Sequence, residues 1–328
     1  MRSPASASCR RHCSARVIGS VADIVVVGSL HLDIMVHAPG RPLLGETMVG
    51  QGWAMRPGGK GGNQAVAAAR HGARTAMAGL VGEDDFGVRL RDNLVARGVD
   101  AAAVAIRAGA ASGMSVALVE PSGDYGAVIV SGVNLALDEA ALAPWRGLIQ
   151  GARWLLLQNE VPEAANIAAA GMARGGGARV LLNAAPARAL SPALAMLLDI
   201  LVVNALEAES LCGMAVPDLD TAARAAERLA AVVPCAIVTA GGEGVATANR
   251  GSAARMVRPH RVAVVSTHGA GDAFVGALAA RLAMGDGLDL AVRYANAAAA
   301  LLVGDPDEAR GNPGPDEVAR LLAGEAGE

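Results

Sequence analysis

The sequence contains few aromatic side chains, since Phe, Trp and Tyr make up only 2% of its 328 residues. Hydrophobic residues nevertheless account for 53% of the chain, so the core must be built mainly from Ala, Val and Leu. A chain of this length has enough material for one or two domains with a large buried core.

Long apolar runs and an excess of one charge are also missing. No uninterrupted apolar run is long enough to span a bilayer. The formal net charge is −3 with both signs interspersed, which provides no basic surface for nucleic acid. We therefore expect neither a membrane nor a nucleic-acid partner.

Cysteine is scarce, with four residues in the chain and no CxxC pair. Cys9 and Cys13 flank His12, which is a metal-binding type of cluster, but no second group of ligands follows it. Together with Cys212 and Cys235, this usage fits a reduced, cytoplasmic protein better than a secreted one.

Residues 1–20 are rich in Arg, Ser and Ala, contain no acidic residue and lack the apolar centre of a secretory signal. Their composition suits either an organelle transit peptide or a disordered extension from a start site placed too far upstream. We exclude them from the fold prediction and expect one α/β domain over residues 21–328.

The most informative stretch covers residues 264–280, VVSTHGAGDAFVGALAA. We predict a short buried strand at residues 262–265, a glycine loop, and then an apolar helix. Gly269 and Gly271 let the backbone approach a ligand, and the amides at the helix start favour an anion. Asp272 in the first turn would serve a hydroxyl beside that anion. The alternative is an ordinary tight turn with Asp as a helix cap.

A second glycine-rich segment, GGKGGNQA at residues 58–65, opens an Ala-rich helix that ends near residue 71. Its backbone amides, with Lys60 and Asn63 as donors, suit a small polar ligand. It is neither a P-loop nor a GxGxxG fingerprint. The alternative is a flexible glycine turn without a ligand.

Strands and helices alternate along the chain, most regularly after residue 154, which predicts a parallel sheet flanked by helices. Polar residues recur where the predicted strands end, and one sheet edge would collect them: Asp33, Glu160, Asn183, Asn204, Thr239 and Asp272. Shorter strands at about residues 33–56 and 103–131 lack intervening helices, and they predict a small additional sheet acting as a lid.

GGKGGNQA, NALE at residues 204–207, TAGGEG at 239–244 and GAGDAFVGAL at 269–278 occur in an order that resembles the PfkB family of carbohydrate kinases, especially its ribokinase branch. The resemblance extends from about residue 24 to the C-terminus. It implies a ribokinase-like α/β fold, a mostly parallel central sheet with a small β-sheet lid that also pairs two subunits, and the use of ATP and Mg²⁺.

The resemblance also implies roles for particular residues. Asp272 matches the catalytic base, and the anion hole for the transferred phosphoryl group matches Gly269, Ala270 and Gly271. The sugar-binding set matches His31, Asp33, Gly59, Lys60, Asn63 and Glu160. The nucleotide-binding set matches Asn204, Glu207, Thr239, Gly241, Gly244 and Asn296, with Glu207 contacting Mg²⁺ largely through water.

Two departures from the family pattern bear on function. His31 in GSLHLD stands where ribokinases usually have Asn, and the bulkier imidazole puts ribose itself in question unless the ring turns away. Ser266 replaces an Asp that normally belongs to a monovalent-cation site, and the loop at residues 309–313 is also irregular. We therefore expect weak or absent activation by K⁺.

These observations favour an ATP-dependent kinase that phosphorylates the primary hydroxyl of a small sugar, D-ribose first among them. A nucleoside or another sugar as acceptor is the alternative. A non-catalytic sugar- or nucleotide-binding regulator is disfavoured because Asp272 and the anion hole are both present. A dinucleotide-dependent oxidoreductase is disfavoured because the first strand lacks the glycine fingerprint.

Overall fold

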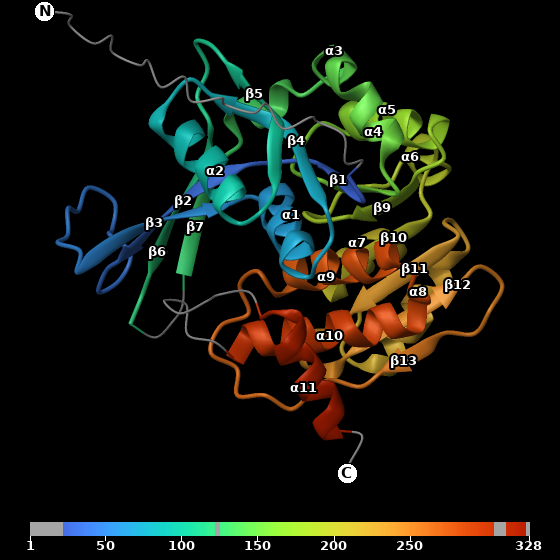
Figure 1. The fold of residues 1–328 in the computed structure, drawn as a ribbon. Coiled ribbons are helices and arrows are strands. Elements are labelled where there is room, and N and C mark those ends of the chain that lie inside the picture. Colours follow the sequence, from blue (N-terminus) through green and yellow to red (C-terminus); the bar gives the residue numbers. More distant parts are fainter. Residues whose placement is uncertain (1–21, 122–124, 305–312, 326–328) are drawn as a thin grey trace, which may run out of the picture.

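A nine-stranded sheet forms the centre of the protein (Figure 1), whose computed structural model describes residues 22–121, 125–304 and 313–325. The strands lie in the order β13-β12-β11-β10-β9-β8-β1-β4-β5. All neighbours from β11 to β5 are parallel, whereas β12 and β13 add an antiparallel edge. Their bounds are β1 Ile24–Val27, β4 Thr75–Gly82, β5 Asp100–Arg107, β8 Trp154–Gln158, β9 Arg179–Asn183, β10 Ile200–Asn204, β11 Cys235–Thr239, β12 Val245–Asn249 and β13 Arg255–Val257.

The central strands read as continuous apolar runs because helices cover both faces of the sheet. One face packs against α3 to α8 and the other against α1, α2 and α9 to α11. Ala, Val and Leu dominate both core layers, which confirms the composition-based prediction. The helices are α1 Lys60–Arg70, α2 Asp85–Ala96, α3 Glu139–Leu142, α4 Arg146–Gly151, α5 Glu163–Gly175, α6 Pro192–Ala195, α7 Ala205–Cys212, α8 Leu219–Ala230, α9 Ala270–Met284, α10 Leu288–Gly304 and α11 Pro315–Glu325. In the described part of the chain, no helix has the length and apolar character needed to cross a membrane.

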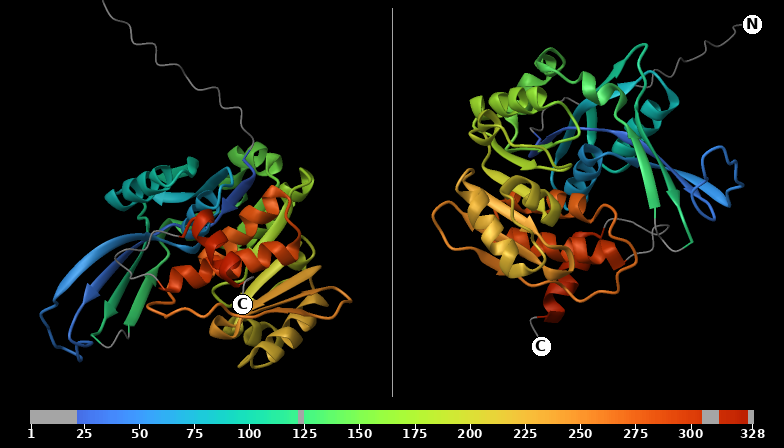
Figure 2. Two further views of the ribbon diagram at one scale, coloured as in Figure 1. Left: turned by 60° about the horizontal axis from the view of Figure 1, so that its bottom comes forward. Right: turned by 180° about the vertical axis from the view of Figure 1, so that it is seen from behind.

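A second sheet of four strands projects from one side of this body (Figure 2). Its order is β3-β2-β6-β7, with bounds β2 His31–His37, β3 Gly52–Gly58, β6 Gly113–Val119 and β7 Tyr125–Val130. Sequence reasoning placed residues from about 103 onward in this sheet, but β5 pairs in parallel with β4 in the large sheet.

One side chain connects the segment that enters the small sheet with the segment that leaves it. Asn134 lies in the short 3₁₀ helix η1, Gly132–Ala136, which follows β7. Its Oδ1 accepts from the Leu30 amide at 3.0 Å, and its Nδ2 donates to the carbonyls of Leu30 and Ser131 at 2.9 and 2.8 Å. The entry to β2 and the exit from β7 are therefore bonded to the same amide group.

The predicted buried strand at residues 262–265 is wrong. The chain between β13 and α9 contains no strand, and Val264 and Val265 are 63% and 55% exposed. The amides of Val265 and Ser266 both donate to the Val303 carbonyl at the end of α10, so a helix end takes the place of a partner strand. The segment therefore crosses the surface as a loop before the glycines.

Candidate functional site

The site is built around the N-terminus of α9. Gly269 caps this helix with φ of 77°, a left-handed conformation that favours glycine, and the helix begins at Ala270. A Cβ on Gly271 would meet nothing within 4 Å, so the first turn borders open space. Its backbone amides and the helix dipole together favour a negatively charged group there.

Asp272 lies in this first turn with only 7% of its surface exposed. Its Oδ2 accepts from Asn63 Nδ2 at 3.0 Å, and its Oδ1 accepts from Gln64 Nε2 at 2.9 Å. Burial raises the pKa of Asp272, while the charge of Lys60 and the two amide donors act in the opposite direction. The result is a buried carboxylate held in one orientation by the start of α1.

Glu160 joins three segments that are distant in sequence. Its Oε2 accepts from Ser29 Oγ at 2.5 Å and from the Lys60 backbone amide at 2.8 Å. His31 Nδ1 lies 3.9 Å from the same oxygen. The loops after β1, β3 and β8 therefore converge on one carboxylate. Because Asn63 and Gln64 at the same helix start donate to Asp272, both acids lie at the N-terminus of α1.

His31 and Asp33 lie on the same face of β2, because side chains two residues apart point the same way in a strand. Gly58 and Gly113 make room for them, since a Cβ there would come within 2.0 Å of Asp33 Oδ2 and 2.3 Å of His31 Cδ2. Asp33 Oδ1 accepts from Ser115 Oγ at 2.5 Å. Asp33 was expected just past a strand of the large sheet, which is wrong: it lies inside β2 of the small sheet.

Asn204 and Glu207 form a reciprocal cap at the start of α7. The Glu207 amide donates to Asn204 Oδ1, and the Asn204 amide donates to Glu207 Oε2, both at 2.9 Å. Burial raises the pKa of Glu207, whereas the Lys60 charge lowers it and that of Asp272 raises it. Asn204 ends β10 next to β9, whose Asn183 accepts from Gln64 beside Asp272, so this cap and Asp272 lie at the same edge of the sheet.

The neighbouring strand supplies the other predicted nucleotide-binding residues. Thr239 ends β11 directly opposite Asn204, and its Oγ1 donates to the Val203 carbonyl at 3.4 Å. Gly241 and Gly244 follow with φ of 56° and 115°. Asn296 is buried in α10, where its Nδ2 donates to the Arg258 carbonyl at 2.9 Å and fastens the chain after β13 to that helix.

Contacts therefore link Asp272 with Asn63, Glu160 with the Lys60 backbone, and Asn204 with Glu207. Sequence reasoning did not single out five polar residues that bond the site residues, one another or the backbone beside them: Ser29, Gln64, Ser115, Asn134 and Gln158. Gln64 has a signal, since it directly follows Asn63 in the glycine-rich motif. Ser115 has none, because its role depends on the pairing of β2 with β6.

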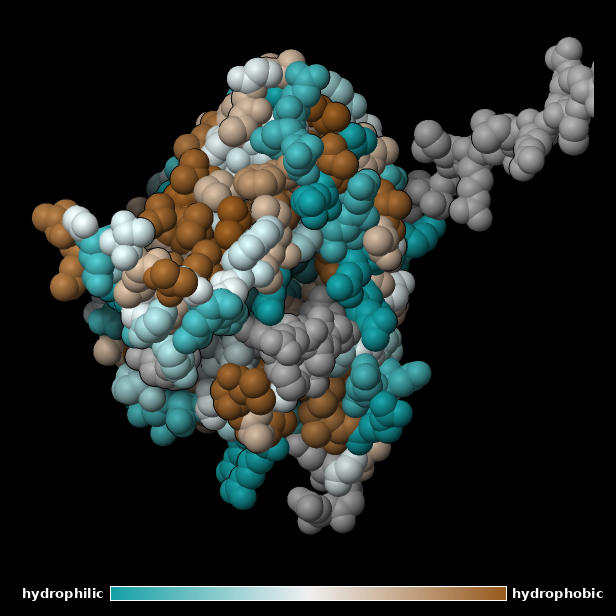
Figure 3. All heavy atoms as spheres, turned by 90° about the vertical axis from the view of Figure 1, so that its left-hand side faces the viewer, coloured by the Kyte–Doolittle hydropathy of each residue, from teal (hydrophilic) through white to brown (hydrophobic). Residues whose placement is uncertain are grey.

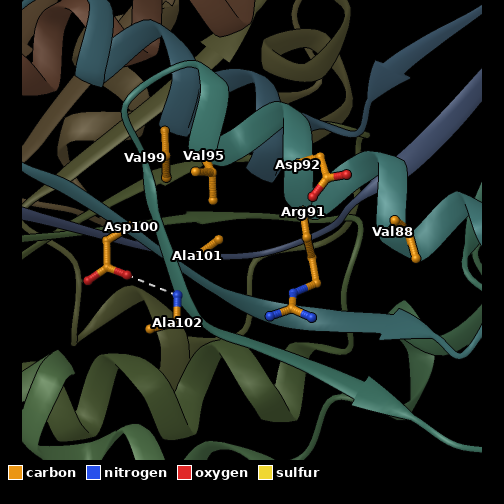
Figure 4. Close-up of a pocket in the computed structure, with 8 residues that line it drawn as sticks. All are labelled: Val88, Arg91, Asp92, Val95, Val99, Asp100, Ala101 and Ala102. Atoms are coloured by element: carbon orange, nitrogen blue, oxygen red, sulfur yellow. Dashed lines mark hydrogen bonds between the residues drawn. The ribbon is translucent and has the colours of Figure 1, made fainter. Parts of the chain in front are cut away.

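A separate cavity of about 450 Å³ lies between α2 and β5 (Figure 4). Its lining includes Val88, Arg91 and Val95 of α2 and Ala101 and Ala102 of β5, and none of its lining residues belongs to the site described above. The N-terminus of α9, not this cavity, carries the polar groups suited to catalysis.

The donor set is compatible with a magnesium ion held mainly by phosphate oxygens and water. Mg²⁺ prefers oxygen ligands and retains several waters, so one or two carboxylates suffice. Among the described residues, no group of three or more His, Cys, Asp or Glu side chains could chelate a metal directly. Glu207 is the carboxylate that the sequence resemblance predicts for this role.

Comparison with known proteins agrees with this geometry. The model of the pfkB family of carbohydrate kinases matches residues 21–313. A ribokinase of Mus musculus is 38% identical over 275 residues, which cover 82% of this chain and 84% of the relative. A ribokinase of Haemophilus influenzae is 34% identical over 281 residues, which cover 85% and 92%.

A solved structure, Arabidopsis thaliana ribokinase complexed with ribose and ATP, aligns with a TM-score of 0.85 at 29% identity. The alignment covers 92% of this chain and 99% of that one. The chain therefore belongs to the PfkB family of carbohydrate kinases. It is an ATP-dependent sugar kinase of the ribokinase type, with the ribokinase-like α/β fold predicted from its motifs.

Proposed function

We propose that the protein transfers the γ-phosphoryl group of ATP to the primary hydroxyl of D-ribose, giving D-ribose 5-phosphate and ADP. One observation carries the proposal: a buried carboxylate, Asp272, is held at an open helix N-terminus by amide donors from α1. This arrangement places a proton acceptor beside a site for a developing anion.

Asp272 takes the proton from the attacking hydroxyl as the new phosphorus–oxygen bond forms and the bond to the ADP oxygen breaks. A positioned base contributes about 10²- to 10⁴-fold to such a step. The backbone amides of Gly269, Ala270 and Gly271 stabilise the charge on the transferred group. In-line positioning and charge neutralisation supply most of the remaining rate enhancement.

The sugar occupies the space between the small sheet and the large one. Asp33 and His31 reach it from β2, and Asn63 and Glu160 reach it from the body, with Lys60 and Gly59 at the start of α1. Carboxylate and amide groups suit vicinal hydroxyls because they accept or donate two hydrogen bonds each.

The nucleotide lies along the ends of β10 and β11 and against α10. Thr239, Gly241 and Gly244 form its phosphate and ribose loop, and Asn296 lies at the adenine end. Asn204 and Glu207 organise Mg²⁺ through water. When bound, that ion neutralises phosphate charge and orients the reacting phosphoryl group.

A different acceptor is the alternative supported by a specific residue. His31 is 3% exposed, and its Nε2 is buried without a hydrogen-bond partner. A nucleoside or another sugar offers that nitrogen different partners from those of ribose. A purely regulatory, non-catalytic role is disfavoured because the base and the helix-start amides are both in place.

We also propose that two copies pair through the small sheet in the cytoplasm. Hydrophobic residues gather on the side of the molecule that carries this sheet (Figure 3), and exposed ones in or beside it include Leu44, Trp53, Val128 and Ile129. A second copy would cover apolar area of this kind. Cys212 and Cys235 are free and buried, consistent with a reducing compartment. Sedimentation of wild type and Trp53→Glu tests the pairing, which fails if wild type is monomeric.

The deciding experiment measures ATP consumption by the purified protein with Mg²⁺ across pentoses, hexoses and nucleosides. Turnover with ribose supports the proposal, whereas silence on ribose with turnover on a nucleoside overturns the choice of acceptor. Asp272→Asn serves as the matched control, because it removes the base while keeping the size of the side chain. It should lower kcat about 10²- to 10⁴-fold without unfolding the protein.

A further inference from the structure

Gln64 is fully buried beside Asp272 and has all of its polar atoms engaged. Its Nε2 donates to Asp272 Oδ1 at 2.9 Å and to Asn183 Oδ1 at 3.0 Å. Its Oε1 accepts from Gln158 Nε2 at 2.8 Å. Two acceptors on one side and a donor on the other allow only one orientation of the Gln64 amide.

Gln158 donates to Gln64 Oε1 through its Nε2, and its own Oε1 is buried without a hydrogen-bond partner among the described residues. It ends β8, is fully buried, and its backbone carbonyl accepts from Asn166 Nδ2 at 2.8 Å. Its Oε1 lies where a Cβ on Gly28 would come within 1.9 Å, so glycine at position 28 makes room for the amide. The space left by Gly28 holds the Gln158 amide oxygen, so that the Gln158 Nε2 faces Gln64.

We infer that Gln64 is a positioning residue that orients Asp272 and stabilises its charged form, through a buried chain of amides beginning at Gln158. Gln64 presents an N–H to Oδ1, so a proton on that oxygen would oppose the donor. The amide therefore favours the carboxylate that can accept a proton from the acceptor hydroxyl, against the effect of burial. The role assigned to Gln64 rests on the proposed function of Asp272 as the base.

The test replaces Gln64 with Met, which preserves length and removes both amide functions. The Asp272 carboxyl carbon is followed by ¹³C NMR against pH in selectively labelled protein and is assigned with Asp272→Asn. Loss of a donor to the charged form should raise the titration midpoint by roughly one to two pH units. At neutral pH, kcat should fall about 10²-fold while the KM for the sugar changes less than about threefold.

Two further variants separate positioning from general stability. Gln158→Met leaves Gln64 in place but removes the donor that orients it, so the midpoint should move in the same direction by a smaller amount. Leu94→Ala removes a buried side chain of α2 that takes no part in the hydrogen bonds of Gln64 or Gln158. It should lower the melting temperature without moving the titration midpoint of Asp272.

An unchanged midpoint in folded Gln64→Met would overturn the inference. If that variant does not fold, an unchanged midpoint in Gln158→Met does so. An equal shift in Leu94→Ala would also overturn it, since destabilisation alone would then explain the effect. Failure of the wild type to phosphorylate any acceptor would refute the proposed function, whereas the NMR titration would still decide the role of Gln64.

Discussion

Gly276 of α9 lies directly against Ala67 of α1: a Cβ at position 276 would come within 2.4 Å of the Ala67 Cβ and 2.7 Å of the Gln64 carbonyl oxygen. Asp272 precedes Gly276 by about one helical turn on the same side of α9. The close approach of the two helices therefore brings the carboxylate within hydrogen-bond distance of the amides at the start of α1.

We predict that Gly276→Ala forces α1 and α9 apart, because the Ala67 Cβ and the backbone of Gln64 and Ala68, none of them flexible, block the added methyl group. The free energy of unfolding should fall by about 1–3 kcal/mol. The kcat should fall at least about tenfold as Asp272 moves away from its donors. Urea unfolding and steady-state kinetics measure the two effects.

Gly171→Ala is the matched control, since Gly171 lies inside α5 and a Cβ there meets nothing within 4 Å. It should leave kcat unchanged and increase stability by up to about 1 kcal/mol through helix propensity. Wild-type stability and activity in Gly276→Ala would contradict the role given to this helix contact.

Asp33→Ala should weaken binding of the sugar and leave binding of the nucleotide intact, because Asp33 belongs to the small sheet and contacts Ser115 there. Loss of a hydrogen bond to a charged group corresponds to roughly a 10- to 100-fold increase in the KM for the sugar. The KM for ATP should stay within about twofold. Asp92→Ala, an exposed change on α2, is the control, and equal increases in both KM values would refute the assignment.

His71 should make the protein less stable in mild acid. It is buried between α1 and α10, with Nδ1 2.9 Å from Tyr294 Oη. Burial, aided by the charges of Arg70 and Arg281, lowers its pKa from the ordinary 6.5 to about 4. Between these values the unfolded chain binds more protons than the folded one, so stability declines as the pH falls.

The full loss attributable to His71 is roughly 3 kcal/mol between pH 6.5 and pH 4. Urea unfolding at pH 7, 6 and 5 should show a shallower decline for His71→Gln, which does not titrate in this range. His37→Gln changes an exposed histidine of β2 and should keep the wild-type slope. Identical slopes in all three proteins would show that His71 is not the group responsible.

We predict weak or absent activation by K⁺, because neutral Ser266 stands where the family usually has a carboxylate. Ser266 Oγ accepts from the His268 backbone amide at 3.4 Å in the loop before α9. Part of the other predicted cation loop, residues 309–312, lies outside the described residues. Replacement of K⁺ with a bulky organic cation should change kcat less than about twofold, and a large loss of rate would contradict the prediction. Ser266→Asp should introduce a dependence on K⁺.

The sequence predicted best those site residues that directly follow or end an apolar strand. Strands of the parallel sheet were predicted from apolar runs, and Asn183, Asn204 and Thr239 do end β9, β10 and β11. The VAVV run at residues 262–265 has the same composition but no partner strand, so composition alone misassigned it. Residues 1–20, proposed as an extension, lie outside the described residues.

The supporting amides could not be predicted in this way. The partners of Gln64 lie 119 and 208 residues away, so the packing of α1 against β9 and α9 decides those contacts. The position of Asp33 was misjudged for a related reason. The chain leaves the large sheet at Gly28 and joins a different sheet three residues later, and no local pattern marks that change.

The amide of Asn134 has a consequence for selectivity. Because it binds both Leu30 and Ser131, it fastens the two ends of the small sheet at one point. We predict that any movement of this sheet carries His31, Asp33 and Ser115 together. A sugar that lacks one matching hydroxyl would then displace all three residues, rather than lose a single hydrogen bond. Discrimination between acceptors should therefore appear in kcat as well as in KM, so the enzyme would reject a poor acceptor by failing to close over it.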